Sequence, residues 1–509
     1  MSIKNTSQLH KAGSSKDLKL LVVVLTGALV FIMAARTPLD TDFWWHIRAG
    51  EVSWQSGAPL LTDLFTFTRL GQTWINHSWL AEIMYYLAYQ GAGFFGVGLL
   101  VALLAVAAMM LVFAQLEGPD LLKPAVIILA STVAAPVWSP RPQLFSLVLF
   151  AGVYLILDRY RRQGKDRLWL MPILFILWSN LHAGYTLGFL LLGVVIAGEI
   201  LNSVLQKEPE KRLGWSEIRK IFFWSLVCLA VVLINSNGLA TWLVPFKTVR
   251  VEALRQLIDE WASPDFHQLY LQPFLWMLFA VFTAIGLSRR RIDGVDLVGV
   301  IGFGYLALLA KRNFAPFALF SAPVVARYCW AVIQSWREER QETGRSGLWQ
   351  KITSQSNARP LDPRLRRVIN LLICALLCFA GIAKLAAATQ SAFVEQAAAD
   401  YFPVEAVNHL KTQNPGRLFN SYGWGGYIEW NLHEFPVFID GRTDLFGDEI
   451  ISEWLNTMQA QDGWQDTFYA WDIRYCLIES DNPLAGALKN EGVEVLYEDQ
   501  NSVLFKVSE

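Results

Sequence analysis

Two aspartates, Asp40 and Asp42, lie near the start of the stretch TPLDTDFWWHIRAGE (37–51), which follows an apolar segment. Asp40 and Asp42 share one side of an extended chain but not one side of a helix. A carboxylate at this point can take the proton of an attacking hydroxyl, or hold that hydroxyl by its charge. Asp42 can equally cap the helix expected from Phe43, a role worth about 1 kcal/mol in any protein. The residues alone leave both roles open, and the two roles can coexist.

Three histidines are candidates to assist Asp40 and Asp42. His46 lies one helical turn after Asp42, on the same helix face, where it can orient a carboxylate or a phosphate. His77 and His182 are expected at a comparable depth. Each histidine is also readily explained as a polar residue at the membrane interface. The three histidines together with Asp40 and Asp42 could also bind a divalent metal such as Mg²⁺ or Mn²⁺, although their spacing in the sequence is scattered.

Three basic residues stand at the outer ends of apolar segments, where the positive-inside bias disfavours Lys and Arg. Arg141 lies between two prolines, and Lys311 and Arg312 are adjacent. Basic side chains at the outer interface can bind an anionic group, and Arg can bind two phosphate oxygens at once. The alternative is that these side chains reach the headgroups of the outer leaflet. We predict that all three converge on the cavity that holds Asp42.

A membrane-embedded scaffold must position these residues. The chain has 509 residues, of which 54% are apolar, 13% aromatic and only 17% charged, a composition typical of a polytopic α-helical membrane protein. We predict about eleven transmembrane helices from the apolar segments. They lie near residues 18–35, 93–115, 122–138, 142–158, 168–183, 185–204, 221–235, 270–287, 296–310, 314–334 and 368–388.

The basic residues indicate how these helices are oriented. The N-terminus, residues 1–17, carries three lysines and is predicted to stay in the cytoplasm. Alternate loops, among them the long cytoplasmic loop 336–367, are also rich in Arg or Lys. A cleavable signal peptide is the other explanation for the basic start and first apolar segment. We predict a multi-pass protein of the cell (inner) membrane, with a transmembrane domain at residues 18–389.

A long first outer loop, residues 36–92, separates the first two apolar segments. A helix is predicted from Phe43 to Gly57, where the glycine ends it. The next stretch, APLLTDLFTFTRLGQTW, has the composition of strands and a turn. A second helix is predicted in HSWLAEIMYYLAYQGAG, which ends in glycines. Both helices are expected to lie along the membrane surface.

The C-terminal residues 390–509 differ from the rest of the chain in charge. From Asp400 onward they contain 19 acidic and 6 basic residues, which favours a place outside the cytoplasm. Predicted helices at 403–412, 448–458 and 483–489 alternate with the strand-like stretches RLFN, FPVFID, RYCLIES, VEVLYED and SVLFKV. We predict a small extracytoplasmic α/β domain.

The stretch IDGRTDLFG places Asp440 and Arg442 just after one of these predicted strands, where α/β domains usually bind ligands. The functional hypothesis is that the C-terminal domain closes over the first outer loop and helps to select an acceptor. The simpler explanation is an arginine that staples a turn by pairing with two aspartates.

The order of the motifs resembles a known family. DTDFWWH, GAPLLTDLFTFT and WINHSWL in the first loop are similar to a bacterial branch of the C-type glycosyltransferases, the membrane fold shared by oligosaccharyltransferases and protein O-mannosyltransferases. Further similar motifs follow in order over nearly the whole chain: SPRPQLFS, WSNLHAGY, NSNGLATWLVPF, DEWASPDF, KRNFAPF and GRTDLFG.

The resemblance implies a class of chemistry. Such an enzyme takes a sugar from a polyprenyl-phosphate-linked donor and passes it to a glycan, lipid or protein acceptor at the extracytoplasmic face of the membrane. It implies Asp42 as the catalytic carboxylate, with Asp40 second. The expected substrate-binding residues are His46, His77, Arg141, His182, Lys311, Arg312, Asp440 and Arg442. The expected partners are the donor and membrane lipids, with no nucleic acid.

Two other functions remain open on the sequence. A transporter or flippase of a lipid-linked glycan shares the many apolar segments, but it is expected to show repeated halves and interrupted helices, which we do not find. A non-catalytic membrane assembly protein uses the acidic C-terminal residues for protein contacts and leaves Asp40 and Asp42 as helix caps.

Overall fold

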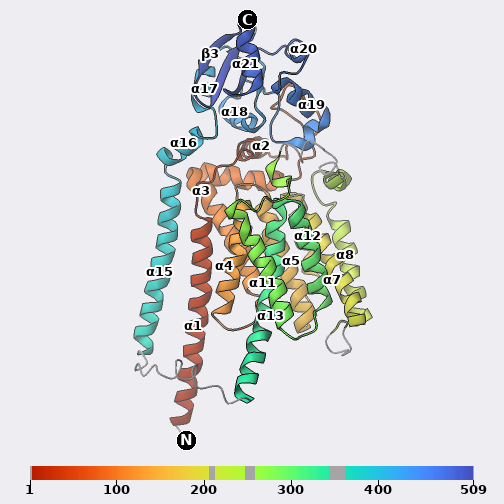
Figure 1. Cartoon of the computed structure of the whole chain (residues 1–509), viewed down its shortest axis with the longest axis vertical. Coiled ribbons are helices and arrows are strands. Elements are labelled where there is room, and N and C mark those ends of the chain that lie inside the picture. The colour runs from red at the N-terminus through yellow and green to blue at the C-terminus, as the bar shows by residue number, and fades with distance from the viewer. Residues whose placement is uncertain (1–2, 206–211, 247–257, 343–361, 508–509) are drawn as a thin grey trace.

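The computed structural model describes residues 3–205, 212–246, 258–342 and 362–507. A tall bundle of helices forms most of the molecule, and a smaller C-terminal domain lies over the end of the bundle opposite to the N-terminus (Figure 1). We call the end beneath the C-terminal domain the outer end. Part of the predicted cytoplasmic loop 336–367 lies outside the described residues.

A helix occupies each of the eleven predicted apolar intervals. These helices are α1 (Ile3–Ala34), α3 (Trp79–Phe113), α4 (Leu122–Ala134), α5 (Gln143–Gln163), α6 (Leu170–Leu181), α7 (Tyr185–Leu205), α8 (Trp215–Val231), α11 (Gln272–Leu287), α12 (Gly294–Leu309), α13 (Phe314–Glu342) and α15 (Pro363–Ala388). Within the described ranges, six helices are long and apolar enough to cross a membrane by length and composition. The multi-pass architecture is therefore confirmed, while the count of eleven crossings stays a prediction.

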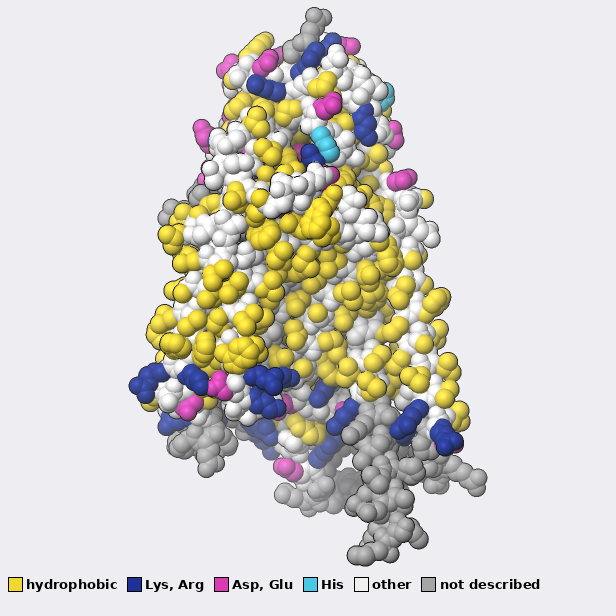
Figure 2. Space-filling view, turned by 180° about the vertical axis from the view of Figure 1, so that it is seen from behind, with side chains coloured by type: hydrophobic (Ala, Val, Ile, Leu, Met, Phe, Trp, Pro, Cys, Tyr) yellow, Lys and Arg dark blue, Asp and Glu magenta, His cyan; other side chains and the backbone are white. Residues whose placement is uncertain are grey.

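The surface of the bundle agrees with a membrane environment. Hydrophobic side chains cover the middle of the face drawn in Figure 2, and Lys and Arg side chains gather below them, at the end nearer the N-terminus. Lys and Arg are retained on the cytoplasmic side of membrane proteins. The predicted orientation, with the C-terminal domain outside the cytoplasm, fits this distribution and stays a prediction.

The first outer loop folds as two helices, as predicted. Helix α2 (Phe43–Ser56) ends at Gly57, whose φ of 67° lies in the left-handed region that favours glycine. Helix α3 begins at Trp79 and breaks at Ala92 and Gly93, where φ and ψ are not helical. Because of this break, the first part of α3 runs across the outer end of the bundle. Helix α2 also lies across this end (Figure 1).

The C-terminal domain contains a four-stranded sheet in the order β1-β2-β4-β3. The parallel pair is β1 (Leu418–Asn420) with β2 (Tyr475–Glu479), and β4 (Ser502–Lys506) runs antiparallel to both β2 and β3 (Glu494–Glu498). The predicted α/β composition is thus confirmed. The helices that accompany the sheet are α16 (Ser391–Ala399), α17 (Val404–Leu410), α18 (Gly425–Asn431), α19 (Thr443–Met458), α20 (Trp464–Ala470) and α21 (Pro483–Asn490).

The stretch FPVFID is not one of the four strands, contrary to the prediction. Val437 instead forms isolated bridges with Thr66 of the first outer loop and with Leu418 of β1. Its N–H donates to the carbonyl of Phe65 at 3.3 Å, and its own carbonyl accepts from the N–H of Phe67 at 3.1 Å. A segment predicted as a strand therefore joins the C-terminal domain to the first outer loop through backbone hydrogen bonds.

Candidate active site

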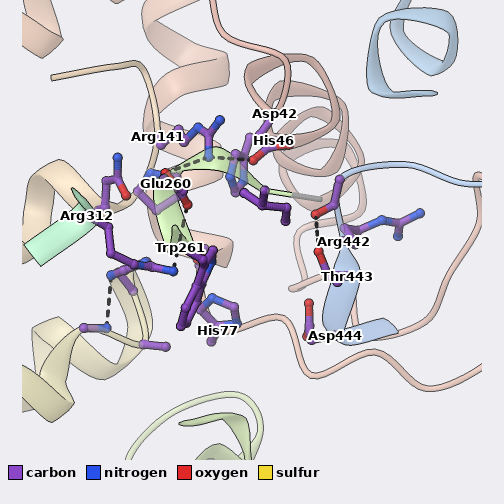
Figure 3. Close-up of a pocket in the computed structure, with 18 of the residues that line it drawn as sticks. Asp42, His46, His77, Arg141, Glu260, Trp261, Arg312, Arg442, Thr443 and Asp444 are labelled. Carbon is purple, nitrogen blue, oxygen red and sulfur yellow. Dashed lines mark hydrogen bonds and ion pairs between the residues drawn. The ribbon is translucent and has the colours of Figure 1, made fainter. Parts of the chain in front are cut away.

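A cavity of about 680 Å³ lies where the bundle meets the C-terminal domain. Its wall comes from many parts of the chain, among them the start of α2, the segments before α3 and α5, the turn between α6 and α7, the 3-10 helices η4 (Asp259–Trp261) and η6 (Lys311–Asn313), and the start of α19. Figure 3 shows how the side chains from these parts face one another. The lining residues with polar or aromatic side chains include Asp42, His46, His77, Arg141, His182, Glu260, Trp261, Arg312, Tyr422, Thr443 and Asp444.

Asp42 does not cap α2 with its side chain. Its φ of −82° and ψ of −17° are already helical, and its carboxylate makes no capping hydrogen bond. A capping residue normally has extended φ and ψ, and its side chain accepts a hydrogen bond from a backbone N–H of the first turn. The carboxylate instead lies 2.9 Å from the guanidinium of Arg141, on the wall of the cavity. The simpler explanation of Asp42 as a cap is therefore not what this geometry favours.

Arg141 holds three carboxylates together. Its Nε donates to Asp40 at 2.6 Å, and its Nη1 lies 2.9 Å from Asp42 and 3.5 Å from Glu260. Burial lowers the pKa of Arg141, but these carboxylates outweigh burial and raise it. Because three anions already surround this guanidinium, its geometry favours a role in positioning Asp42 over the predicted direct contact with a phosphate.

The surroundings of Asp42 make its carboxylate unusually basic. Burial raises its pKa to about 6, opposed by Arg141 and reinforced by Asp40 and Glu260. A carboxylic acid with this pKa is ionised at neutral pH but accepts a proton more readily than an exposed aspartate does. Gly441 keeps the C-terminal domain in contact with it, since a Cβ at that position would meet Asp42 Oδ1 at 2.1 Å.

The adjacent cations Lys311 and Arg312 point in different directions. The guanidinium of Arg312 lines the cavity, lies 4.2 Å from the ring centre of Trp261, and has the carboxylate of Glu260 at 3.9 Å. Lys311 is not part of the cavity wall, and its ammonium pairs with the exposed side chain of Asp259, at the edge of the cavity. The structure thus brings Arg141 and Arg312 to the cavity and places Lys311 beside it.

The three predicted histidines all line the cavity. His46 Nδ1 lies 3.1 Å from Glu82 Oε1, and this contact fixes the imidazole ring. Burial is the main reason that the pKa of His46 lies well below its usual value. The rings of His77 and His182 lie 5.8 Å apart between centroids, and burial also lowers the pKa of His77. Burial therefore disfavours the charged form of His46 and of His77.

Asp440 and Arg442 are buried, and of the two only Arg442 is among the residues that line the cavity. The side chain of Arg442 is 0% exposed, and its Nη2 lies 2.5 Å from Asp440 and 2.7 Å from Asp63 of the first outer loop. The Arg442 guanidinium is also about 5 Å from the ring centres of Phe65 and Trp74. This geometry favours the predicted alternative, an arginine between two aspartates, but the second aspartate comes from the first loop instead of the same turn.

Glu260 and Trp261 are cavity residues that the sequence did not single out. Their motif, DEWASPDF, was one of those noted for the resemblance, and it was the available signal. Glu260 pairs with Arg141 and Arg312, which lie 119 and 52 positions away in the sequence. Tyr422 and Thr443, from the C-terminal domain, were likewise not singled out, and their hydroxyls are 2.6 Å apart in the cavity wall.

The described residues do not fit the divalent metal that the scattered histidines and aspartates suggested. Within the described ranges, no three His, Cys, Asp or Glu side chains are grouped as metal ligands. The position between Asp40 and Asp42, where a cation would be expected, holds the guanidinium of Arg141. We therefore derive no catalytic step through a metal.

Comparison with known proteins adds the fold family. No protein-family model and no curated protein matches the sequence. The chain is similar to the Archaeoglobus fulgidus oligosaccharyltransferase tethered with an acceptor peptide (TM-score 0.53, 11% identity, covering 96% of this chain and 74% of that one). It is also similar to the archaeal oligosaccharyltransferase AglB from Archaeoglobus fulgidus in complex with an inhibitory peptide and a dolichol-phosphate (TM-score 0.52, 11% identity, 90% and 69% covered).

A third similar structure is ArnT from Cupriavidus metallidurans bound to undecaprenyl phosphate (TM-score 0.48, 12% identity, 96% and 97% covered). Identities this low establish the fold alone. The predicted resemblance is confirmed at that level, since the chain has the membrane fold of the C-type glycosyltransferases and oligosaccharyltransferases.

Proposed function

We propose that this protein transfers a sugar from a polyprenyl-phosphate-linked donor to an acceptor hydroxyl or amide in the cavity beside Asp42. One observation carries the proposal: a carboxylate with a pKa of about 6 and the guanidinium of Arg312 face the same cavity at the outer end of an apolar helical bundle. The fold supports it, because the similar archaeal oligosaccharyltransferase was solved with a dolichol-phosphate.

The proposed reaction is a single displacement at the anomeric carbon of the donor. The acceptor oxygen or nitrogen forms a bond to that carbon and loses its proton to the carboxylate of Asp42. The bond from the anomeric carbon to the phosphate oxygen breaks, and its electron pair leaves with the lipid phosphate. The negative charge of this leaving group is stabilised by the guanidinium of Arg312.

The C-terminal domain is proposed to bind the acceptor. Tyr422 and Thr443 line the cavity, and Gly441 contacts Asp42 directly. An acceptor held against this wall would be close to the proposed base. The Tyr422→Phe substitution, which removes the hydroxyl bonded to Thr443, is expected to raise KM for the acceptor and leave KM for the donor unchanged. A rise in donor KM alone would contradict this assignment.

The proposed topology places the N-terminus in the cytoplasm and the C-terminal domain outside. Basic side chains at the inner end of the bundle support it (Figure 2). A reporter that is active only in the cytoplasm, fused after the last residue, should stay silent. Strong reporter activity would overturn the topology and the outer placement of the cavity.

Sugar transfer itself is testable with the full-length protein in lipid nanodiscs. We would supply a panel of radiolabelled undecaprenyl-phosphate sugars with a mixture of glycan and peptide acceptors, and follow the release of undecaprenyl phosphate. The expected result is the consumption of one donor. Asp42→Asn should lower the rate by about a hundredfold or more, as expected for a lost general base.

The matched control for this substitution is Asp265→Asn. Asp265 is exposed, pairs with His267 at 2.8 Å, and does not line the cavity. The control variant should transfer sugar at the wild-type rate. A normally folded Asp42→Asn variant with full activity would refute the catalytic role of this carboxylate. Movement of the labelled lipid between leaflets without cleavage would favour the flippase alternative.

A further inference from the structure

His182 is held in the cavity wall by hydrogen bonds to one of its two ring nitrogens. Its Nδ1 lies 2.8 Å from Ser146 Oγ and 3.0 Å from the backbone N of Gly184. Ser146 in turn accepts a hydrogen bond from the indole Nε1 of Trp178 at 2.7 Å. The imidazole is therefore attached to α5, to α6 and to the turn that leads into α7.

These contacts determine where the proton of the imidazole is. A backbone N–H can only donate, so Nδ1 of His182 must accept from Gly184 and carries no hydrogen. The indole N–H of Trp178 can also only donate, which leaves the hydroxyl hydrogen of Ser146 directed to Nδ1. A neutral imidazole has one N–H, and in His182 it must therefore be on Nε2.

Gly184 is needed for this arrangement. A Cβ at that position would lie 2.2 Å from Ser146 Oγ and 2.8 Å from His182 Nδ1, so any other residue would separate the hydrogen-bonded atoms. Trp178, His182 and Gly184 all belong to the motif WSNLHAGY, and Ser146 ends the motif SPRPQLFS. The hydrogen bonds among these four residues thus explain why the two motifs carry a serine, a tryptophan, a histidine and a glycine at these positions.

The free ring nitrogen belongs to the cavity. His182 is only partly buried and lines the cavity together with Arg312, and among the described residues no partner is recorded for its Nε2. An N–H that is fixed in direction and has no protein partner is suited to an anionic oxygen, because the hydrogen bond to a charged acceptor is about twice as strong as a neutral one. The same proton prevents Nε2 from acting as a metal ligand.

We propose that His182 offers a fixed Nε2–H to a phosphate oxygen of the polyprenyl lipid, and that Ser146, Trp178 and Gly184 are positioning residues that hold this tautomer. This inference rests on the proposed function, since it assigns a residue to the phosphate of the same donor. His182 and Arg312 then contact the phosphate from two parts of the chain, α6–α7 and η6. Asp42 is left free to act on the acceptor.

The tautomer can be measured without sugar transfer. The chain has only seven histidines, so selective ¹⁵N labelling of histidine in nanodiscs gives few signals. The His182 signals are assigned by their loss in His182→Gln. We expect a bare Nδ1 and a protonated Nε2 at pH 7.5. A protonated Nδ1, or a ring protonated on both nitrogens, would overturn the proposal.

Lipid addition tests the assigned ligand. Undecaprenyl phosphate should shift the Nε2–H signal, while undecaprenol, which has the same chain without the phosphate, should not. An unchanged Nε2 signal at saturating undecaprenyl phosphate would overturn the proposal, as would an equal shift with the alcohol. A chain that shows the expected shift but transfers no sugar would contradict the proposed function and leave this assignment in place.

Substitutions separate positioning from mere packing. His182→Gln keeps an N–H donor near the position of Nε2, whereas His182→Leu does not. We expect the leucine variant to bind undecaprenyl phosphate about tenfold or more weakly. The glutamine variant should recover most of that affinity. Ser146→Ala should let the other tautomer appear in the NMR spectrum. Equal affinities for the glutamine and leucine variants would contradict a donor role.

Discussion

The two ends of the helical bundle each carry a cluster of paired charges, and the clusters differ in what they leave open. At the inner end, Arg161 lies 2.5 Å from Glu199 and 3.0 Å from Asp293, and Arg327 pairs with Asp296. The side chains of Glu199 and Asp296 are 2% and 1% exposed. Each of these guanidinium groups is matched to carboxylates inside packed helices.

At the outer end, the same kinds of groups surround a cavity. Asp42 lies on the cavity wall, and the carboxylate of Glu260 is 3.9 Å from the guanidinium of Arg312. The outer cluster also draws its members from loops and 3-10 helices, while the inner cluster is built on the helices α5, α7, α12 and α13. A dense set of charges therefore does not identify a site, whereas incomplete pairing beside a cavity does.

The largest expected effect in this comparison is on the stability of the inner cluster. Arg327→Met removes the closer partner of the buried Asp296 and leaves it, among the described residues, paired only with the guanidinium of Arg162, at 3.6 Å, which should lower the free energy of unfolding by up to about 3–5 kcal/mol. Thermal unfolding in nanodiscs would measure it. The protein that remains folded should transfer sugar at the normal rate, because this cluster lies away from the cavity.

Lys220→Met is the control at the same end of the bundle. Its ammonium pairs with Asp166, and the two side chains are 47% and 40% exposed. Exposed pairs of this kind contribute little to stability, so the unfolding temperature should barely change. Loss of transfer in Arg327→Met without loss of stability would show that the inner cluster has a function of its own.

The second prediction compares two neighbouring cations of the outer end. Arg312→Gln should raise KM for the donor by about tenfold to a hundredfold, the usual range for a lost hydrogen bond to a charged group. Lys311→Gln should change it by about twofold or less, because Lys311 does not line the cavity and its ammonium pairs with the exposed side chain of Asp259. Steady-state kinetics would check both. Equal effects of the two substitutions would contradict the assignment of the phosphate to Arg312.

The third prediction concerns the acid that links the two outer arginines. Glu260→Gln removes the charge shared by Arg141 and Arg312 and should lower kcat/KM by about tenfold. Asp265→Asn, five residues further along the same segment, should leave it unchanged. An unaffected Glu260→Gln variant would mean that Arg141 positions Asp42 without help from η4.

The fourth prediction concerns the pH dependence of transfer, which leaves the rate at neutral pH unchanged. The base must be ionised, and the pKa of Asp42 is raised to about 6, so kcat/KM should be constant above that pH. Below it, the rate should fall by about tenfold for each pH unit as the carboxylate becomes protonated. Return to pH 7.5 should restore activity, which controls for unfolding. A rate that stays constant down to pH 4.5 would contradict a base with this pKa.

Much of the scaffold could be predicted because apolar length and glycine positions act locally. Each of the predicted apolar segments holds a helix, and α2 ends at Gly57 as its sequence indicates. The strand predicted at FPVFID was wrong for the opposite reason. Val437 pairs with Thr66, which is far away in the sequence, and no local pattern records such a pairing.

The site was only partly predictable for the same reason. Asp42, Arg141, Arg312 and the three histidines were identified by residue type at outer segment ends, and all of them line the cavity. Residue type cannot distinguish Lys311 from Arg312, because a single position within η6 decides which side chain faces the cavity. Nor can it reveal that Arg442 is buried against Asp63, since this contact exists only once the first loop and the C-terminal domain have docked.

The most direct test of the central claim is an experimental structure of the full-length protein with undecaprenyl phosphate. We predict density for the phosphate in the cavity between α2, η4 and η6, with an oxygen within hydrogen-bonding distance of the Arg312 guanidinium and the polyprenyl chain leading away into the membrane. Phosphate density at the inner cluster around Arg327, or at the outer surface with the cavity empty, would contradict the assignment of this cavity as the site of sugar transfer.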